Sequence, residues 1–123
     1  LWVWLDDNTN SHSLIGKRGG TQNEYWILHQ GGEGFKVRVW DGGTSTDRIA
    51  STVGVGSTGQ WYFVVVWHDA TANTLNIQID DGTVDSSSYT AGINDSNSEF
   101  DLGRQPGGDY FDGRLDSVSI WKR

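Results

Sequence analysis

The sequence predicts an all-β fold, a sandwich of two antiparallel sheets, from three observations. The 123 residues include 17 glycines and one proline beside many Asn, Asp, Ser and Thr residues, which indicates frequent turns. Aromatic residues make up 12% of the chain, with seven tryptophans, and favour strands. No stretch shows sustained helical periodicity. The length suits one core, so we expect residues 1–123 to form a single domain, a piece of a longer protein because the chain opens inside a strand.

The central element is expected to be a hairpin within residues 61–82. Residues 61–67 are seven consecutive aromatic and β-branched residues, which predicts a strand covered on both faces. Leu75, Ile77 and Ile79 alternate with polar residues, which predicts a neighbouring strand with one wet face. The remaining strands must therefore cover the second face of the central strand.

The other strands follow from short apolar or alternating runs between polar turns. Residues 1–5 are apolar on both faces, which predicts a well-covered strand. Residues 35–40 alternate: Phe35, Val37 and Val39 are expected inward, and Lys36, Arg38 and Trp40 outward. The remaining predicted strands are residues 14–17, 24–30, 47–55, 83–89, 99–103 and 111–121. About ten short strands are typical of a two-sheet antiparallel sandwich.

Several of these elements carry more specific expectations. The serine-rich strand after the hairpin is expected at a sheet edge. The strand after that is expected to turn Phe100 and Leu102 inward. Residues 105–109 are predicted to form a turn. In the last strand the apolar phase shifts between Leu115 and Val118, which predicts a bulge.

The formal net charge is −7. This charge repels nucleic acids and anionic membrane surfaces, because both bind clustered Lys and Arg. It suits cations and neutral ligands such as sugars. The chain has no cysteine, hence no disulfide or thiolate metal site, and no apolar run of membrane-spanning length. We therefore expect neither nucleic-acid binding nor membrane insertion.

The closing stretch has a recognisable motif, "F-x-G-x-L-D-x-V-x-I-W". Its positions are Phe111, Gly113, Leu115, Asp116, Val118, Ile120 and Trp121. This motif resembles the closing signature of laminin G-like domains of the concanavalin A-like superfamily. The central stretch, with Gly59, Trp61 and residues 75–82, and the opening from Trp4 to Lys17 fit the same family. The resemblance implies a jelly-roll sandwich at the cell or virion surface that binds carbohydrates, glycosaminoglycans or proteins, often with calcium and rarely with catalysis.

The resemblance also implies where calcium could bind. Calcium prefers carboxylate, amide and carbonyl oxygens on loops. In the calcium-binding members an acidic residue precedes one strand, here Glu24, and a second Asp or Asn lies in a later loop, here Asn94, Asp95 or Asn97. The alternative is that these residues are ordinary turn formers.

Other candidate ligand-binding residues are tryptophans and a second polar loop. An indole face can stack on the apolar face of a pyranose. Trp40 is the best candidate because it falls on the outward phase of its strand, and Trp26 and Trp67 are next. Most of the seven tryptophans are expected in the core. Asp6 and Asp7 open an oxygen-rich loop that could bind a ligand.

No catalytic constellation stands out, and we expect no enzyme. Residues 54–59 spell GxGxxG, but a strand rather than a helix follows, so the motif is rejected. Glu99 and Asp101 lie two apart on one strand face, where related glycosidases have E-x-D-x-x-E, yet Arg104 replaces the second Glu. The alternative, a solvated strand face neutralised by Arg104, is favoured. The three histidines have no ligand spacing, so zinc is not expected.

Three functional hypotheses follow. The first is a non-catalytic module of a larger extracellular or virion surface protein, which binds a glycan or cell-surface polymer in rim loops, with calcium as the expected cofactor. The second is a structural or protein–protein interaction domain, for decoration or adhesion, which an extended exposed apolar patch would favour. The third is a fragment of a glycoside hydrolase.

Overall fold

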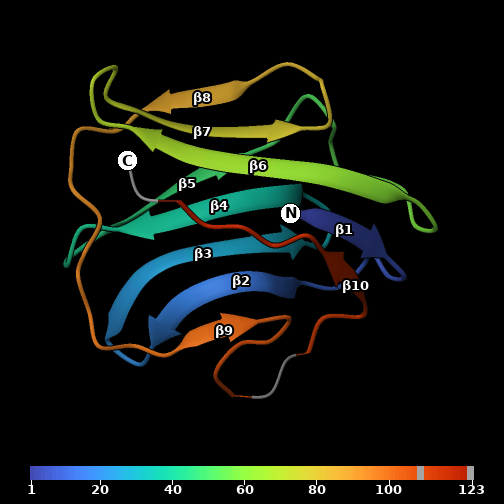
Figure 1. The fold of residues 1–123 in the computed structure, drawn as a ribbon, viewed down its shortest axis with the longest axis horizontal. Coiled ribbons are helices and arrows are strands. Elements are labelled where there is room, and N and C mark those ends of the chain that lie inside the picture. The colour runs from blue at the N-terminus through green and yellow to red at the C-terminus, as the bar shows by residue number, and fades with distance from the viewer. Residues whose placement is uncertain (108–109, 122–123) are drawn as a thin grey trace.

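A computed structural model describes residues 1–107 and 110–121. Ten strands form two five-stranded antiparallel sheets (Figure 1). The first sheet has the order β10-β1-β6-β7-β8 and the second the order β5-β4-β3-β2-β9. The strands are β1 Trp2–Leu5, β2 His12–Gly19, β3 Gln22–Gln30, β4 Gly34–Trp40, β5 Ser45–Ile49, β6 Trp61–Asp69, β7 Thr74–Ile79, β8 Asp85–Ser88, β9 Phe100–Leu102 and β10 Gly113–Asp116. The described residues contain no helix, and the predicted all-β jelly-roll sandwich is confirmed.

The core lies between the inner faces of the two sheets. The inward positions predicted for β4 are confirmed, because Phe35, Val37 and Val39 are buried in it. Lys36 on the outer face is also buried, by its ion pairs with Glu33 and Asp47. The Phe35 ring meets His29 and Tyr62 edge-on, with centroids 5.3 and 5.1 Å away. The predicted partner of the central strand is also confirmed, since Leu75, Ile77 and Ile79 of β7 are all buried. Strand β8 lies at the edge of the first sheet, as predicted.

The prediction that β6 is covered on both faces is wrong. Trp61 and Trp67 are 40% and 37% exposed on the outer face of the first sheet. Trp2 of β1 is exposed as well, so that strand is also covered on one face only. Aromatic rings there shield one another across the strands instead of meeting a covering layer: Trp2 lies 5.0 Å from Phe63 and Trp4 5.8 Å from Trp61.

Two strands end at least five residues before the predicted position. Strand β5 ends at Ile49, because the chain then turns and the amides of Val53 and Gly54 both donate to the Ala50 carbonyl at 3.2 Å. Strand β10 ends at Asp116, and Ser117 has a positive φ of 50°, so the phase shift marks the end of a strand and not a bulge. The turn predicted at residues 105–109 lies partly outside the described residues.

The prediction that Phe100 and Leu102 point inward and are buried is wrong, because neither side chain is buried. They lie opposite Lys17 and Ile15, yet they are 49% and 47% exposed, whereas Asp101 between them is 5% exposed. Strand β9 is the edge of the second sheet, where no further strand covers its flank. An edge position therefore overrides the alternation that the sequence suggests.

Candidate functional site

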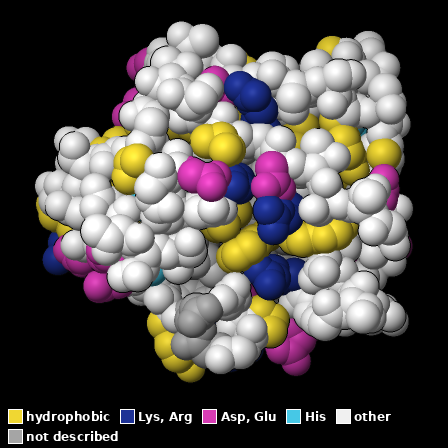
Figure 2. Space-filling view, turned by 180° about the vertical axis from the view of Figure 1, so that it is seen from behind, with side chains coloured by type: hydrophobic (Ala, Val, Ile, Leu, Met, Phe, Trp, Pro, Cys, Tyr) yellow, Lys and Arg dark blue, Asp and Glu magenta, His cyan; other side chains and the backbone are white. Residues whose placement is uncertain are grey.

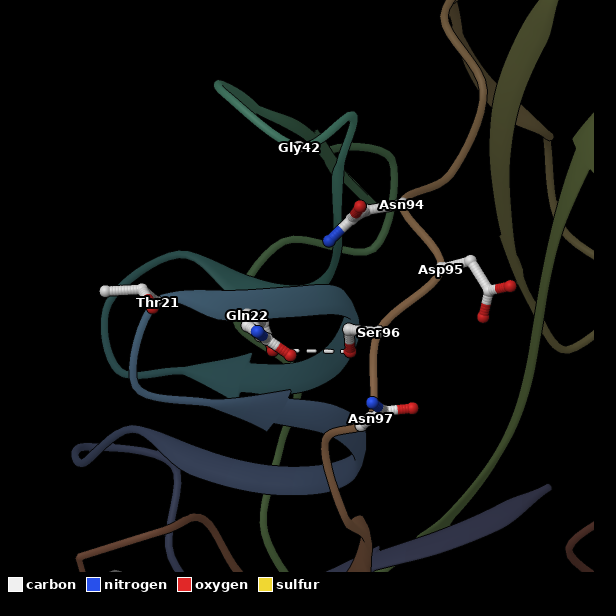
Figure 3. Close-up of a pocket in the computed structure, with 7 residues that line it drawn as sticks. All are labelled: Thr21, Gln22, Gly42, Asn94, Asp95, Ser96 and Asn97. Atoms are coloured by element: carbon white, nitrogen blue, oxygen red, sulfur yellow. Dashed lines mark hydrogen bonds between the residues drawn. The ribbon is translucent and has the colours of Figure 1, made fainter.

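A polar hollow lies at the rim of the sandwich. It is formed by the β2–β3 turn, the β4–β5 turn and the segment that runs from β8 along one side of the molecule to β9 (Figures 1 and 3). Its volume is about 520 Å³, and we call it the rim hollow. It is lined by Thr21, Gln22, Gly42, Asn94, Asp95, Ser96 and Asn97. Every lining side chain other than glycine carries hydrogen-bonding atoms.

Hydrogen bonds hold the 94–98 segment against the second sheet. The Asn94 amide donates to the Trp40 carbonyl at 2.7 Å, and its side-chain Nδ2 donates to the Asn23 carbonyl at 3.1 Å. The hydroxyls of Ser96 and Ser98 both donate to the Gln22 carbonyl. This segment is therefore fixed in place before any ligand arrives.

Side chains of this segment alternate in direction. Asn94 and Ser96 point toward the β2–β3 turn, whereas Asp95 and Asn97 project to the other side of the chain (Figure 3). Asn94 and Ser96 thus face the Thr21 and Gln22 side of the hollow, whereas the Asp95 carboxylate and the Asn97 amide lie across the segment from those residues. Such a set can both donate to and accept from the hydroxyl groups of a small polar ligand.

Glu24 and Lys17 lie beneath this segment. Lys17 Nζ donates to Glu24 Oε1 at 2.5 Å and to the Ser96 carbonyl at 2.8 Å, while the Ser96 amide donates to Glu24 Oε1 at 2.6 Å. Burial alone would raise the pKa of Glu24, but the hydrogen bonds from Lys17 and Ser96 outweigh burial and the pKa lies below its ordinary value. The hydrogen bond to Glu24 raises the pKa of Lys17 in turn. Both groups are therefore charged at neutral pH.

The expected calcium ligands come together only in part. Glu24 does contact the loop that carries Asn94, Asp95 and Asn97, as the family resemblance implies. However, its carboxylate already binds an ammonium group, so the site does not fit a calcium ion with Glu24 as a ligand. In the described part of the chain, no three His, Asp or Glu side chains gather as a metal site. Calcium binding elsewhere in the loop stays a prediction.

The three candidate tryptophans lie apart. Trp40 and Trp26 are half-buried on the second sheet. Trp40 lies near Arg38. Trp26 lies under Arg18, whose Cζ is 3.9 Å from the Trp26 ring centroid. Hydrophobic side chains lie among Lys, Arg and acidic ones on the back of the molecule (Figure 2). Trp67 belongs to the other sheet. Trp40 is connected to the rim hollow by its backbone carbonyl, which accepts a hydrogen bond from the Asn94 amide.

Asp6 and Asp7 do not line the rim hollow. The Asp7 carboxylate accepts hydrogen bonds from the Thr9 hydroxyl at 2.6 Å and the Thr9 and Asn10 amides at 3.0 Å, and it contacts His12. The bonds from Thr9 hold the pKa of Asp7 well below its usual range. Asp6 accepts from Trp4 Nε1 at 2.9 Å. Asp7 thus organises its own loop, whereas its role in ligand binding stays a prediction.

Arg104 lies between the two acidic residues of the glycosidase hypothesis. Its Nε is 2.5 Å from Asp101 Oδ1, and another guanidinium nitrogen is 3.7 Å from Glu99, which is 84% exposed. This arrangement favours the neutralised strand face over a catalytic pair. The absence of enzyme activity nevertheless stays a prediction.

Sequence reasoning missed two features. Thr21 and Gln22 carried no functional prediction, because their proximity to Asn94 depends on pairings between residues more than 70 positions apart. A second hollow of about 250 Å³ lies on the outer face of the first sheet and is lined by Trp2, Trp61, Asp116 and Ser117. The exposed aromatic face that contains it consists of Trp2, Trp61 and Trp67. The expectation that most of the seven tryptophans lie in the core is wrong, because none of them is buried.

Its two antiparallel five-stranded sheets define this chain as a β-sandwich of the jelly-roll type. Residues 1–123 match a laminin G family model whose description is Concanavalin A-like lectin/glucanases superfamily. The chain therefore belongs to this superfamily, as its closing motif indicated. The comparison with curated proteins and the comparison with solved structures gave no match.

Membership supports a coarse functional statement. Laminin G-like and concanavalin A-like domains bind glycans or proteins and are typically extracellular, so the prediction of a carbohydrate- or protein-binding module is confirmed at that level. Across residues 1–107 and 110–121, no helix has the length and apolar character needed to cross a membrane.

Proposed function

We propose that this domain is a non-catalytic carbohydrate-binding module that takes a neutral glycan in the rim hollow, as part of a larger extracellular or virion surface protein. The observation that carries the proposal is the lining of the hollow, where every side chain other than glycine can make hydrogen bonds. Sugar hydroxyls both donate and accept, and the amide groups of Gln22, Asn94 and Asn97 do the same.

Size and rigidity support this function. A volume of about 520 Å³ falls among those of small-molecule sites, roughly 300–1,000 Å³. The 94–98 segment is already held by the Trp40, Asn23 and Gln22 carbonyls, so binding costs little conformational entropy.

Charge narrows the class of glycan. The net charge of −7 disfavours polyanions such as sulfated glycosaminoglycans. Lys17, the cation beneath the hollow, is already paired with Glu24. Neutral oligosaccharides therefore suit the site better than anionic ones.

The test is a glycan array followed by calorimetry on the best neutral ligand. We expect Gln22→Ala and Asp95→Ala each to weaken binding about 2- to 10-fold, because a lost hydrogen bond costs about 0.5–1.5 kcal/mol. Gln22→Ala keeps the backbone carbonyl that holds Ser96 and Ser98. Asp81→Ala, an equally exposed carboxylate at the β7–β8 turn, serves as the control and should bind like the wild type. Full affinity in both hollow variants, or no glycan bound at all, contradicts the proposal.

The aromatic face favours a second candidate, a protein-binding module. Large exposed aromatic side chains are enriched where proteins bind each other, and Trp2, Trp61 and Trp67 are all exposed on one sheet. The calorimetry shows which of the two surfaces binds the glycan. If the rim hollow binds the glycan, Trp61→Ser leaves the affinity unchanged, whereas loss of binding in this variant moves the site to the aromatic face.

A further inference from the structure

We propose that Lys17 is the built-in cation of this site: its ammonium group clamps the 94–98 segment onto Glu24, where a divalent metal ion would otherwise be needed, and makes the rim hollow independent of calcium. The clamp consists of residues of this chain alone. Its consequence for ligand binding rests on the proposed function.

The ammonium contacts the type of oxygen that a hard cation prefers. Lys17 Nζ is 2.5 Å from the carboxylate oxygen Oε1 of Glu24 and 2.8 Å from the backbone carbonyl oxygen of Ser96. Carboxylate and carbonyl oxygens are also the usual calcium ligands. An ammonium group satisfies them with directed N–H donors instead of coordination bonds.

The two side chains together bind both sides of one peptide residue. Glu24 Oε1 accepts from the Ser96 amide at 2.6 Å, and Lys17 donates to the carbonyl of the same residue. The backbone amide and carbonyl of Ser96 are thus both hydrogen-bonded, as they would be by a neighbouring strand. Asp95 and Asn97, which line the rim hollow on either side of it, are positioned by the same clamp.

A strand irregularity brings the two clamp residues together. The β2–β3 register shifts between Lys17 and Arg18, directly opposite Glu24. Without such a bulge Lys17 and Glu24 would point to opposite faces of the sheet, because successive side chains alternate in a regular strand. The pairing is thus built into the sheet and does not depend on a flexible surface contact.

Burial makes the clamp necessary and excludes a second cation. Glu24 is 7% exposed, and a buried carboxylate without a partner is strongly destabilising. A divalent ion at Glu24 Oε1 would lie within hydrogen-bond reach of the Lys17 ammonium, where like charges repel. Calcium therefore cannot take the place of the ammonium at Glu24 Oε1 while Lys17 stays there.

The test uses amide hydrogen exchange of residues 94–98 and thermal unfolding, each with calcium and with chelator. The wild type should give the same midpoint and the same exchange in both conditions. Lys17→Met keeps the aliphatic stem and removes the charge, so the Ser96 amide should exchange at least about 10-fold faster, the effect of losing a charged hydrogen-bond partner. Lys17→Arg keeps a cation and should largely restore protection. Lys36→Met removes another buried, paired lysine and should leave exchange at 94–98 unchanged.

A wild-type midpoint that rises with calcium, with the rise lost in Glu24→Gln, would overturn the proposal. Unchanged exchange at Ser96 in Lys17→Met would do so too. If Lys17→Met does not fold, the proposal is tested by the calcium dependence of the wild-type midpoint and by the exchange protection in Lys17→Arg. None of these measurements involves a glycan, so failure of the clamp and failure of the proposed function are distinguished.

Discussion

Replacing Phe35 with alanine is expected to lower the free energy of unfolding by about 3–5 kcal/mol. The Phe35 side chain is fully buried between the sheets, with ring contacts to His29 and Tyr62. Its removal leaves a cavity that the surrounding strands cannot fill, because each is fixed by hydrogen bonds on both sides. Urea unfolding followed by tryptophan fluorescence measures the loss.

Phe63→Ala is the matched control for this substitution. Phe63 lies on the outer face of the first sheet, half-buried beside Trp2. The same chemical change there should cost only about 1–2 kcal/mol, because less area is buried and no closed cavity forms. Equal losses in the two variants would mean that the core does not lie between the sheets where Phe35 lies.

Replacing Asp85 with alanine is expected to cost about 2–4 kcal/mol. The buried Asp85 carboxylate on β8 of the first sheet joins the second sheet at one edge. It accepts hydrogen bonds from Arg48 at 3.0 Å, the Ser51 hydroxyl at 2.6 Å and the Thr52 amide at 3.2 Å. Its loss removes three hydrogen bonds at once, including the one from the half-buried Arg48. The exposed Asp81, changed to alanine, should alter stability by less than about 0.5 kcal/mol.

The hydrogen bonds to Asp85 also predict how stability depends on pH. Burial alone would raise the pKa of Asp85, but hydrogen bonds from Ser51, Thr52 and Arg48 outweigh burial and lower the pKa below its ordinary value of 3.8. The unfolded chain then binds a proton more readily than the folded one, so the stability from Asp85 is present above pH 3.8 and is lost as the pH falls further. The Asp85→Ala variant should show a shallower loss of stability in acid than the wild type. Identical acid profiles would contradict this account of Asp85.

Much of the fold could be predicted from local pattern, and the failures share a cause. Alternation placed Phe35 and Ile77 in the core correctly, because period-two patterns report directly on a sheet with one buried face. The run at residues 61–67 misled, because aromatic residues on an outer face look like residues of a buried strand when only the sequence is seen. For Phe100 the alternation was clear, but its exposure depends on β9 being an edge strand, which is a property of the topology.

The site could be predicted only in part for a similar reason. Its Asn- and Asp-rich loop is visible in the sequence, and the family resemblance linked Glu24 to that loop. Lys17 was not identified, because its pairing with Glu24 depends on a register shift between β2 and β3 that no local pattern shows. Gln22 was missed since its partner Ser96 lies 74 positions away.

The most direct test of the central claim, a glycan bound in the rim hollow, is an NMR titration. Amide ¹H–¹⁵N shifts of the intact domain are followed while a neutral oligosaccharide that binds on the array is added. Shift changes centred on residues 21–22, 42 and 94–97 are the result we predict. Changes centred on Trp2, Trp61 and Ser117, with the rim hollow silent, would contradict the claim and assign binding to the aromatic face.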